Sequence, residues 1–137
     1  MSEKTIVVDS RVLWTKTGIT VGGNFVRVEV ISGQWTANPA TGLYGPHGHP
    51  HLVAKPGYAG PHMPEGCLLL KYRQKGDVIL WYKTGPVDIN TTPPTESIYH
   101  SELLLACNDD ANNQYGSGYK DNQGSLTVKI TWQSNPI

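Results

Sequence analysis

The segment Leu126-Thr127-Val128-Lys129-Ile130-Thr131-Trp132 alternates strictly between apolar and polar side chains. Successive side chains of a β-strand point to opposite faces, so this pattern predicts a strand with its four apolar side chains on one face. The segment Val26-Arg27-Val28-Glu29-Val30 follows the same rule. Both segments are therefore expected to be strands that bury one face.

Short β-branched and apolar runs, separated by turn residues, predict further strands. Fifteen glycines and ten prolines punctuate the chain, and no window of helix length shows a 3.6-residue period. Many short strands with this spacing are typical of an antiparallel β-sandwich, so we expect residues 1–137 to form one all-β domain. The further strands are expected at Ile6–Val8, Val12–Trp14, Ile19–Val21, Cys67–Tyr72, Val78–Tyr82 and Ile98–Cys107.

Composition limits the classes of partner. The formal net charge is zero and charged residues make up 16% of the chain, which disfavours nucleic acid and anionic membranes as main partners. No apolar run reaches the roughly 18 residues of a membrane span. The segment Met1–Thr5 has no apolar signal-peptide core, so we expect a cytoplasmic location.

Cys67 and Cys107 lie in apolar runs, which favours buried free thiols over a disulfide or a reactive thiol.

Two long polar segments, Thr36–Glu65 and Asn108–Ser125, do not fit a strand pattern. Loops longer than about 12–15 residues in a compact domain are usually functional or disordered. Because the sheets of a sandwich supply a rigid base, function is commonly found on such loops. We expect the two loops to meet at one end of the sandwich and to form one site.

The second of these loops concentrates hard oxygen donors. Asp109, Asp121 and Asn122 carry carboxylate or amide oxygens, and Gly116 and Gly118 let the backbone fold tightly between them. These are the ligands that calcium requires, although the spacing is not that of an EF-hand. The same residue types are also ordinary turn formers, so a loop that binds nothing is the alternative.

Three alternating histidines, His47, His49 and His51, lie in the first loop. In an extended segment their side chains would point to one side and suggest zinc. The glycine and proline between them favour a tight turn instead, and His62 would join only if the loop folds back. The alternatives are exposed loop histidines, or one histidine that donates a hydrogen bond to a ligand.

Aromatic residues accompany the polar ones in or beside both loops. Aromatic faces combined with amide and carboxylate groups are typical of sugar sites, because sugars stack through their C–H faces and hydrogen-bond through their hydroxyls. For Trp35 we favour a packing role beneath the loop. The aromatic residues are Trp35, Tyr44, Tyr58, Tyr115 and Tyr119.

Catalytic patterns are weak. The chain has no nucleophile-elbow, zinc-protease or phosphate-loop motif. Glu65 and Glu96 could in principle form a glycosidase pair, but nothing in the sequence ties them together. We therefore expect a binding protein rather than an enzyme.

Several segments, taken in order, resemble the LecA-type (galactophilic) calcium-dependent galactose-binding lectins of bacteria. The resemblance extends from about Val12 to Ile130. Each segment alone is weak, whereas their order and spacing together are fairly specific. The segments are Ile19–Val21 followed by Val28–Trp35, Tyr44-Gly45-Pro46-His47-Gly48-His49-Pro50, Pro64 with Gly66, Leu68 and Lys71, and Asn108-Asp109 followed by Tyr115-Gly116 and Asp121–Leu126.

This resemblance implies a jelly-roll β-sandwich, of the galactose-binding-domain type, that binds calcium. Asp109, Asp121 and Asn122 would give side-chain oxygens to the metal, and Asn38 would give a main-chain carbonyl. Another carbonyl would come from the 115–118 region, for which Gly118 and Gln114 are the candidates. Five protein ligands and two sugar hydroxyls would then fall within the usual range for calcium.

The resemblance also implies how the sugar binds. Hydroxyls O3 and O4 of galactose would coordinate the calcium and donate hydrogen bonds to Asp109 and Asp121. His49 matches the family histidine that contacts O6, and Pro50 follows it. The expected sugar-binding residues are Asn38, His49, Pro50, Asp109, Gly118 and Asp121.

The chain departs from the family pattern around this site. Asp121 replaces an asparagine and adds a negative charge, the loop between Asp109 and Asp121 is longer, and Leu52 replaces a glutamine that helps to hold O6. A tyrosine of the family is Asn38 here. These changes place the exact sugar preference in doubt and leave the metal site in place.

We therefore expect a non-catalytic, calcium-dependent lectin for galactose and α-galactosides. Its partners would be galactose-containing glycans of glycoproteins or glycolipids, reached after release from the cell. The resemblance implies a homo-oligomer, a tetramer, with the tail Trp132–Ile137 as a candidate contact. The alternatives are a non-catalytic carbohydrate-binding module, and a β-sandwich in which calcium only stiffens the loop.

Overall fold

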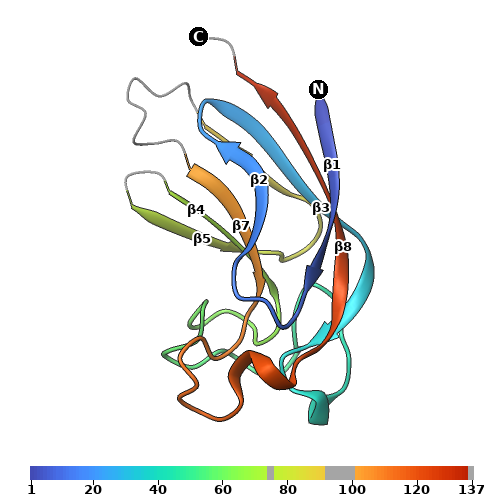
Figure 1. Ribbon diagram of the computed structural model, residues 1–137, viewed down its shortest axis with the longest axis vertical. Coiled ribbons are helices and arrows are strands. Elements are labelled where there is room, and N and C mark those ends of the chain that lie inside the picture. Colours follow the sequence, from blue (N-terminus) through green and yellow to red (C-terminus); the bar gives the residue numbers. More distant parts are fainter. Residues whose placement is uncertain (74–75, 92–100, 136–137) are drawn as a thin grey trace.

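The computed structural model describes residues 1–73, 76–91 and 101–135, which form two antiparallel four-stranded sheets packed face to face (Figure 1). One sheet has the order β1-β8-β3-β6 and the other β2-β7-β4-β5. The predicted β-sandwich is therefore confirmed. The strands are β1 (Ser2–Asp9), β2 (Thr15–Val21), β3 (Asn24–Thr36), β4 (Leu68–Arg73), β5 (Asp77–Trp81), β6 (Val87–Asn90), β7 (Ser101–Cys107) and β8 (Gln123–Ser134).

The alternating segments form the centre of the first sheet. Leu126, Val128 and Ile130 of β8 are fully buried, and Val28 of β3 is paired with Ile130. Their polar neighbours point the other way. Leucines of β4 and β7 cover these side chains from the second sheet and complete one core. The predicted inward faces of both strands are confirmed.

Strand β4 is buried on both of its faces. Leu68, Leu69 and Leu70 are all fully buried, whereas a strand with one wet face would alternate. The β3–β4 loop, residues 37–67, explains this because it folds back over the outer face, and Gly60 lies so close to Leu69 that a Cβ there would overlap it. The β3–β4 loop therefore packs against the sheet of β4 and β7, beside the end of β7.

The structure corrects one predicted strand and adds another. Val12–Trp14 is a bend that follows a turn, in which Val12 N donates to Asp9 O at 3.1 Å and the Asp9 carboxylate accepts the backbone N–H of Arg11 at 2.8 Å. Strand β6 was not predicted, since it is short and pairs with β3 alone. Strand β8 already begins at Gln123, two residues before the predicted loop ends. The predicted start of the strand at Ile98–His100 lies outside the described residues.

Both cysteines are free and buried, as predicted. Burial raises the pKa of the Cys67 thiol to about 12 and that of Cys107 well above its ordinary value. Neither thiol is therefore ionised or reactive at neutral pH.

The helices of the described residues are short 3₁₀ turns, η1 (Pro39–Thr41) and η3 (Gly118–Asp121), and none could cross a membrane.

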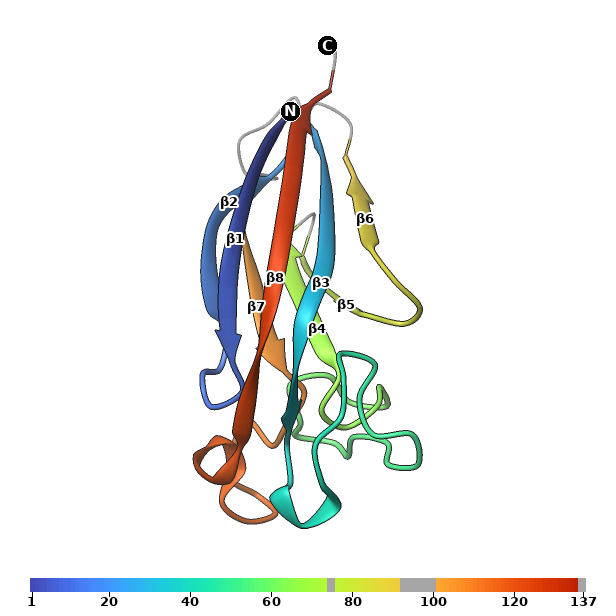
Figure 2. The same ribbon diagram turned by 90° about the vertical axis from the view of Figure 1, so that its right-hand side faces the viewer.

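The two long loops lie together at the end of the sandwich where β1 ends and β8 begins (Figures 1 and 2). The β3–β4 loop and the β7–β8 loop, residues 108–122, pair through an isolated bridge between Tyr58 and Asp110. Ala59 N also donates to Asp109 O at 3.0 Å. The prediction that both loops meet at one end is confirmed.

Candidate functional site

Asn108 holds the two loops together. It is completely buried, and its amide nitrogen donates to the carbonyls of Gly60 and Pro64 at 2.8 and 3.0 Å. Its amide oxygen accepts from Gly60 N at 2.8 Å. A side-chain amide that both donates to and accepts from a neighbouring backbone pairs with it much as an adjacent β-strand would. Asn108 is therefore a structural residue that fixes the backbone position of the adjoining Asp109.

Trp35 supports the site from below. It is fully buried and its indole N–H donates to Gly66 O at 2.7 Å, which fits the predicted packing role. Its backbone pairs with Tyr44, whose hydroxyl accepts the N–H of Ala37 at 3.0 Å. These contacts set the path of the chain from the end of β3 into Asn38.

A polar hollow of about 280 Å³ opens between the loops. Among the predicted site residues, four line it: Asn38, Asp109, Gly118 and Asp121. Asn122, His49, Pro50 and the alternative ligand Gln114 do not line it, although the Asn122 side chain lies beside Asp109. The remaining lining residues are Ala37, Tyr58, Glu65, Asp110, Tyr115, Gly116 and Ser117.

Asp109 is a buried carboxylate with an unpartnered oxygen. It is 4% exposed, its Oδ1 accepts the N–H of Asp110 at 2.7 Å, and its Oδ2 has no hydrogen-bond partner. Burial raises the pKa of Asp109 to about 6, against the lowering effect of the Asp110 N–H and of the nearby Asn122 side chain. The site therefore holds a negative charge that the protein does not neutralise.

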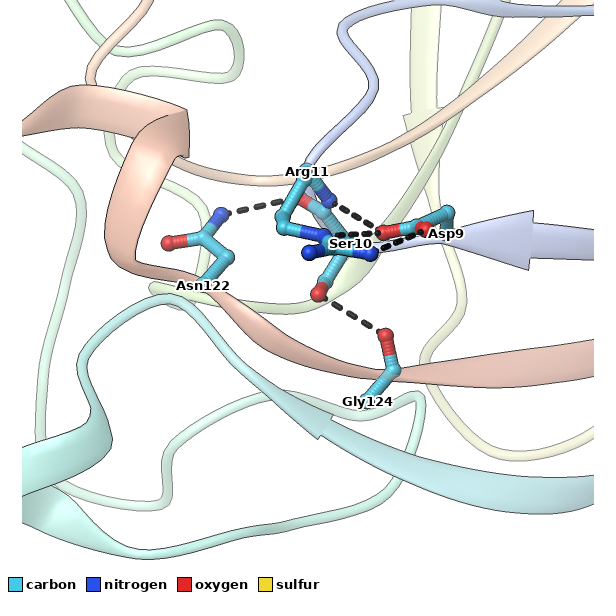
Figure 3. A network of polar contacts seen from close by, with 5 residues as sticks. All are labelled: Asp9, Ser10, Arg11, Asn122 and Gly124. Carbon is cyan, nitrogen blue, oxygen red and sulfur yellow. Dashed lines mark hydrogen bonds and ion pairs between the residues drawn. The ribbon is translucent and has the colours of Figure 1, made fainter.

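Asn122 presents a second unpartnered oxygen. It is 3% exposed, and its amide nitrogen donates to Ser10 O at 2.8 Å, which turns the amide oxygen away from Ser10 (Figure 3). The Ser10 hydroxyl in turn donates to Gly124 O at 2.8 Å. In the described residues, three buried side-chain oxygens or nitrogens lack a partner, and two of them are Asp109 Oδ2 and Asn122 Oδ1.

Gly118 and Asp121 come from η3, at the end of the β7–β8 loop. Gly118 is buried with φ +61°, and a Cβ there would overlap the Asn113 side chain and lie 3.1 Å from Asp110 O. Only glycine fits this close approach without strain. Asp121 is exposed, so its carboxylate is free to meet a ligand at the hollow.

Asn38 fits the predicted ligand set less well. Its side chain caps η1 by accepting from Ala40 N at 3.1 Å. Its main-chain carbonyl already accepts the Thr36 hydroxyl, the Thr41 hydroxyl and the Thr41 N–H, at 2.8, 2.8 and 3.0 Å. These donors would have to move before the carbonyl could bind a cation. The adjoining Ala37 also lines the hollow.

Asp110 explains how the lengthened loop folds, a role that the sequence reasoning missed. Its carboxylate accepts the N–H groups of Asn112 and Tyr115 at 3.2 and 2.7 Å. Burial alone would raise the pKa of Asp110, but the N–H groups of residues 112–115 outweigh it and the pKa is lowered. An aspartate that turns the chain two residues later is a recognisable signal for such a turn.

Glu65 is a further carboxylate of the hollow that the sequence reasoning considered only as half of a catalytic pair. Burial raises the pKa of Glu65, opposed by Lys55 and by His49. Its proposed partner Glu96 lies outside the described residues. Tyr58 and Tyr115, predicted as aromatic neighbours of a site, do line the hollow.

The three histidines of the first loop do not form one cluster: the rings of His49 and His51 lie 6.2 Å apart, but His47 does not join them. His49 packs edge-on against Tyr44 at 5.6 Å between ring centroids, and its Nδ1 accepts from His51 N at 3.1 Å. His47 instead lies against Tyr82. Across residues 1–73, 76–91 and 101–135, no three His, Cys, Asp or Glu side chains are placed to hold a metal. The zinc interpretation is not supported, and any cation at the hollow needs amide or carbonyl oxygens too.

Comparison with known proteins shows a similarity of fold. No protein family model and no curated protein sequence matches the chain. A solved structure described as the EclA N-terminal domain, a PllA-like lectin, is similar with a TM-score of 0.54 and 21% sequence identity. The match covers 94% of this chain and 95% of that one. At this identity the likeness concerns the fold: over nearly its whole length, the chain has the β-sandwich fold of that lectin domain.

Proposed function

We propose that this protein is a calcium-dependent lectin that binds galactose-containing glycans and has no catalytic activity. The observation that carries the proposal is the pair of buried, unpartnered oxygens, Asp109 Oδ2 and Asn122 Oδ1, beside the polar hollow. The lectin fold of the similar structure supports a carbohydrate ligand.

A hard cation would satisfy both oxygens. An unpartnered buried polar atom costs about 1–3 kcal/mol, and more if it is charged, so such atoms usually have a function. Asp109, Asn122 and the exposed Asp121 offer carboxylate and amide oxygens, which suit calcium and not zinc. Gly118, which lines the hollow, is favoured over Gln114 as the source of a carbonyl ligand.

The sugar would complete the coordination from the open side. Vicinal hydroxyls of galactose, O3 and O4, can replace water on calcium while they donate hydrogen bonds to Asp109 and Asp121. His49 donates its backbone N–H to Glu65 O at 2.8 Å, so His49 and the adjoining Pro50 lie next to a residue that lines the hollow. In this proposal they stand near O6 of the sugar.

Small polar sites of this kind bind weakly, since little apolar area is buried. Linked sites raise the avidity for glycan surfaces by orders of magnitude without any new contact. We therefore include a homo-oligomer, a tetramer, in the proposal. Size-exclusion chromatography with light scattering measures this directly.

Calorimetric titration with galactose, in calcium and in EDTA, tests the proposed function. We expect binding in calcium only, and loss of both calcium and galactose binding in Asp121→Ala. Asp77→Ala is the matched control, because it removes an exposed carboxylate of β5 away from the hollow. Galactose binding that survives EDTA would refute the mechanism. Calcium binding without any sugar would indicate a structural ion.

A further inference from the structure

Tyr58 and Tyr115 form an aromatic wall on the hollow. Tyr58 comes from the β3–β4 loop and Tyr115 from the lengthened β7–β8 loop, and both line the hollow beside Asp109 and Asp121. Their ring centroids are 5.8 Å apart with the planes inclined by 50°. This is the tilted arrangement in which aromatic pairs attract each other. The two loops thus contribute one ring each to a common surface.

The Tyr115 ring is held in place and yet remains half in water. Its backbone N–H donates to Asp110 Oδ2 at 2.7 Å and its hydroxyl donates to Pro56 O at 2.8 Å. The Lys55 ammonium lies 4.8 Å from the ring centroid. With these restraints the side chain is still 49% exposed. A ring that is ordered in advance loses little entropy when a ligand stacks on it.

Tyr58 links this ring to the proposed metal residues. Its backbone pairs with that of Asp110 through an isolated bridge. A phenol is protonated at neutral pH, so the Tyr58 hydroxyl can donate a hydrogen bond. Tyr58 and the half-exposed Tyr115 therefore line the hollow together with Asp109 and Asp121.

We propose that Tyr58 and Tyr115 form a subsite for the second pyranose ring of an oligosaccharide whose terminal sugar is held at the calcium. This proposal rests on the proposed function. The polar lining and the Tyr58 phenol suit the hydroxyls of a sugar, and the half-exposed ring of Tyr115 offers apolar surface to its C–H groups. The protein then distinguishes disaccharides by the unit next to the terminal galactose.

The test is calorimetric titration of the full chain in saturating calcium with methyl galactoside and with a panel of galactose-terminated disaccharides. We expect at least one disaccharide to bind wild-type protein roughly three- to tenfold more tightly than the monosaccharide, the range for one aromatic contact. Tyr115→Ala should remove this gain, so that the affinity for the disaccharide falls by more than the affinity for methyl galactoside. Tyr58→Phe should keep part of the gain, since the ring remains.

Tyr115→Phe is the matched control, because it keeps the ring and removes only the hydroxyl bond to Pro56. It should retain the disaccharide preference, and thermal melting with calcium should show that each variant is folded. If no disaccharide binds more tightly than the monosaccharide, or if Tyr115→Ala weakens both equally, the subsite is refuted while the lectin proposal stands. If wild-type protein binds no sugar in calcium, the proposed function itself fails.

Discussion

Replacing Asp109 by asparagine should stabilise the calcium-free protein. Asp109 is buried, and one of its oxygens has no partner. The amide of an asparagine at this position would keep an oxygen to accept the Asp110 N–H and would remove the buried charge. If the carboxylate is retained to bind calcium, its cost in stability should appear when calcium is absent.

The magnitude follows from the pKa. Burial raises the pKa of Asp109 from 3.8 to about 6, and this difference corresponds to about 3 kcal/mol against folding once both states are ionised. Because the folded pKa is the higher one, the penalty is full above about pH 6 and is relieved as the pH falls towards 4. About half of it, roughly 1.5 kcal/mol, should be gone at pH 5. A gain of about 3 kcal/mol would raise Tm by about 10 °C in a domain of this size.

The assay is urea denaturation and thermal melting of both proteins in EDTA at pH 7 and pH 5. Asp109→Asn should be more stable than wild-type protein at pH 7, and the difference should shrink at pH 5. Glu65, whose pKa is also raised, acts in the same direction in both proteins, so the comparison isolates Asp109. Calcium at about 100 times its Kd should stabilise wild-type protein by about 2.7 kcal/mol and the variant by nothing.

Asp77→Asn, which changes an exposed carboxylate on β5, is the control and should alter stability by no more than about 0.5 kcal/mol. A variant that is less stable than wild-type protein in EDTA at pH 7 would refute the reasoning, because the buried charge would then have a partner. So would wild-type stability that does not rise between pH 7 and pH 5.

His49→Ala should weaken galactose binding by about 1 kcal/mol, the value of one hydrogen bond, and leave calcium affinity unchanged in titration; loss of calcium would indicate a histidine metal site instead. Gly118→Ala should lower the free energy of unfolding by about 1–3 kcal/mol and weaken calcium binding, because φ is +61° and a Cβ would crowd Asp110 O; unchanged melting would contradict this close approach. Asp110→Ala should cost about 1–3 kcal/mol at pH 7, since N–H groups of the β7–β8 loop lose their acceptor. The pKa of Asp110 is lowered, so this contribution is present at neutral pH and decreases as the pH falls from about 4 through the lowered pKa; urea denaturation of both proteins at pH 7 and pH 3 should show a smaller difference at pH 3.

The strands were predictable where one face is wet and the other is buried. Alternation in β8 and β3 marks the core positions directly, because a strand has a period of two. The run Val12–Trp14 is also apolar, but the Asp9 carboxylate accepts the Arg11 N–H in a turn just before it. A local side-chain bond thus overrode the propensity of the segment.

The kinds of side chain at the candidate site were predictable from the sequence, whereas the role of each individual residue was less so. Loop composition identified Asp109, Asp121 and Asn122 as oxygen donors; the structure places Asp109 and Asp121 on one hollow, with the buried Asn122 beside Asp109. It also shows Asp110 to be a loop anchor, and the Asn38 carbonyl to be occupied by three donors. Residues of one type next to each other in sequence differ in role because their partners differ in space.

The sequence by itself determined a β-sandwich with two long polar loops, the second of them rich in hard oxygens, since alternation and loop composition are local properties. Only the tertiary structure decided which oxygens stay without a partner. The amide of Asn122 is oriented by Ser10, 112 residues away in the chain, and Asp109 is buried by loops that Asn108 ties together. Burial and hydrogen-bond partners depend on segments that meet only when the chain is folded, so the feature that carries the proposed calcium site could not be read from either loop alone.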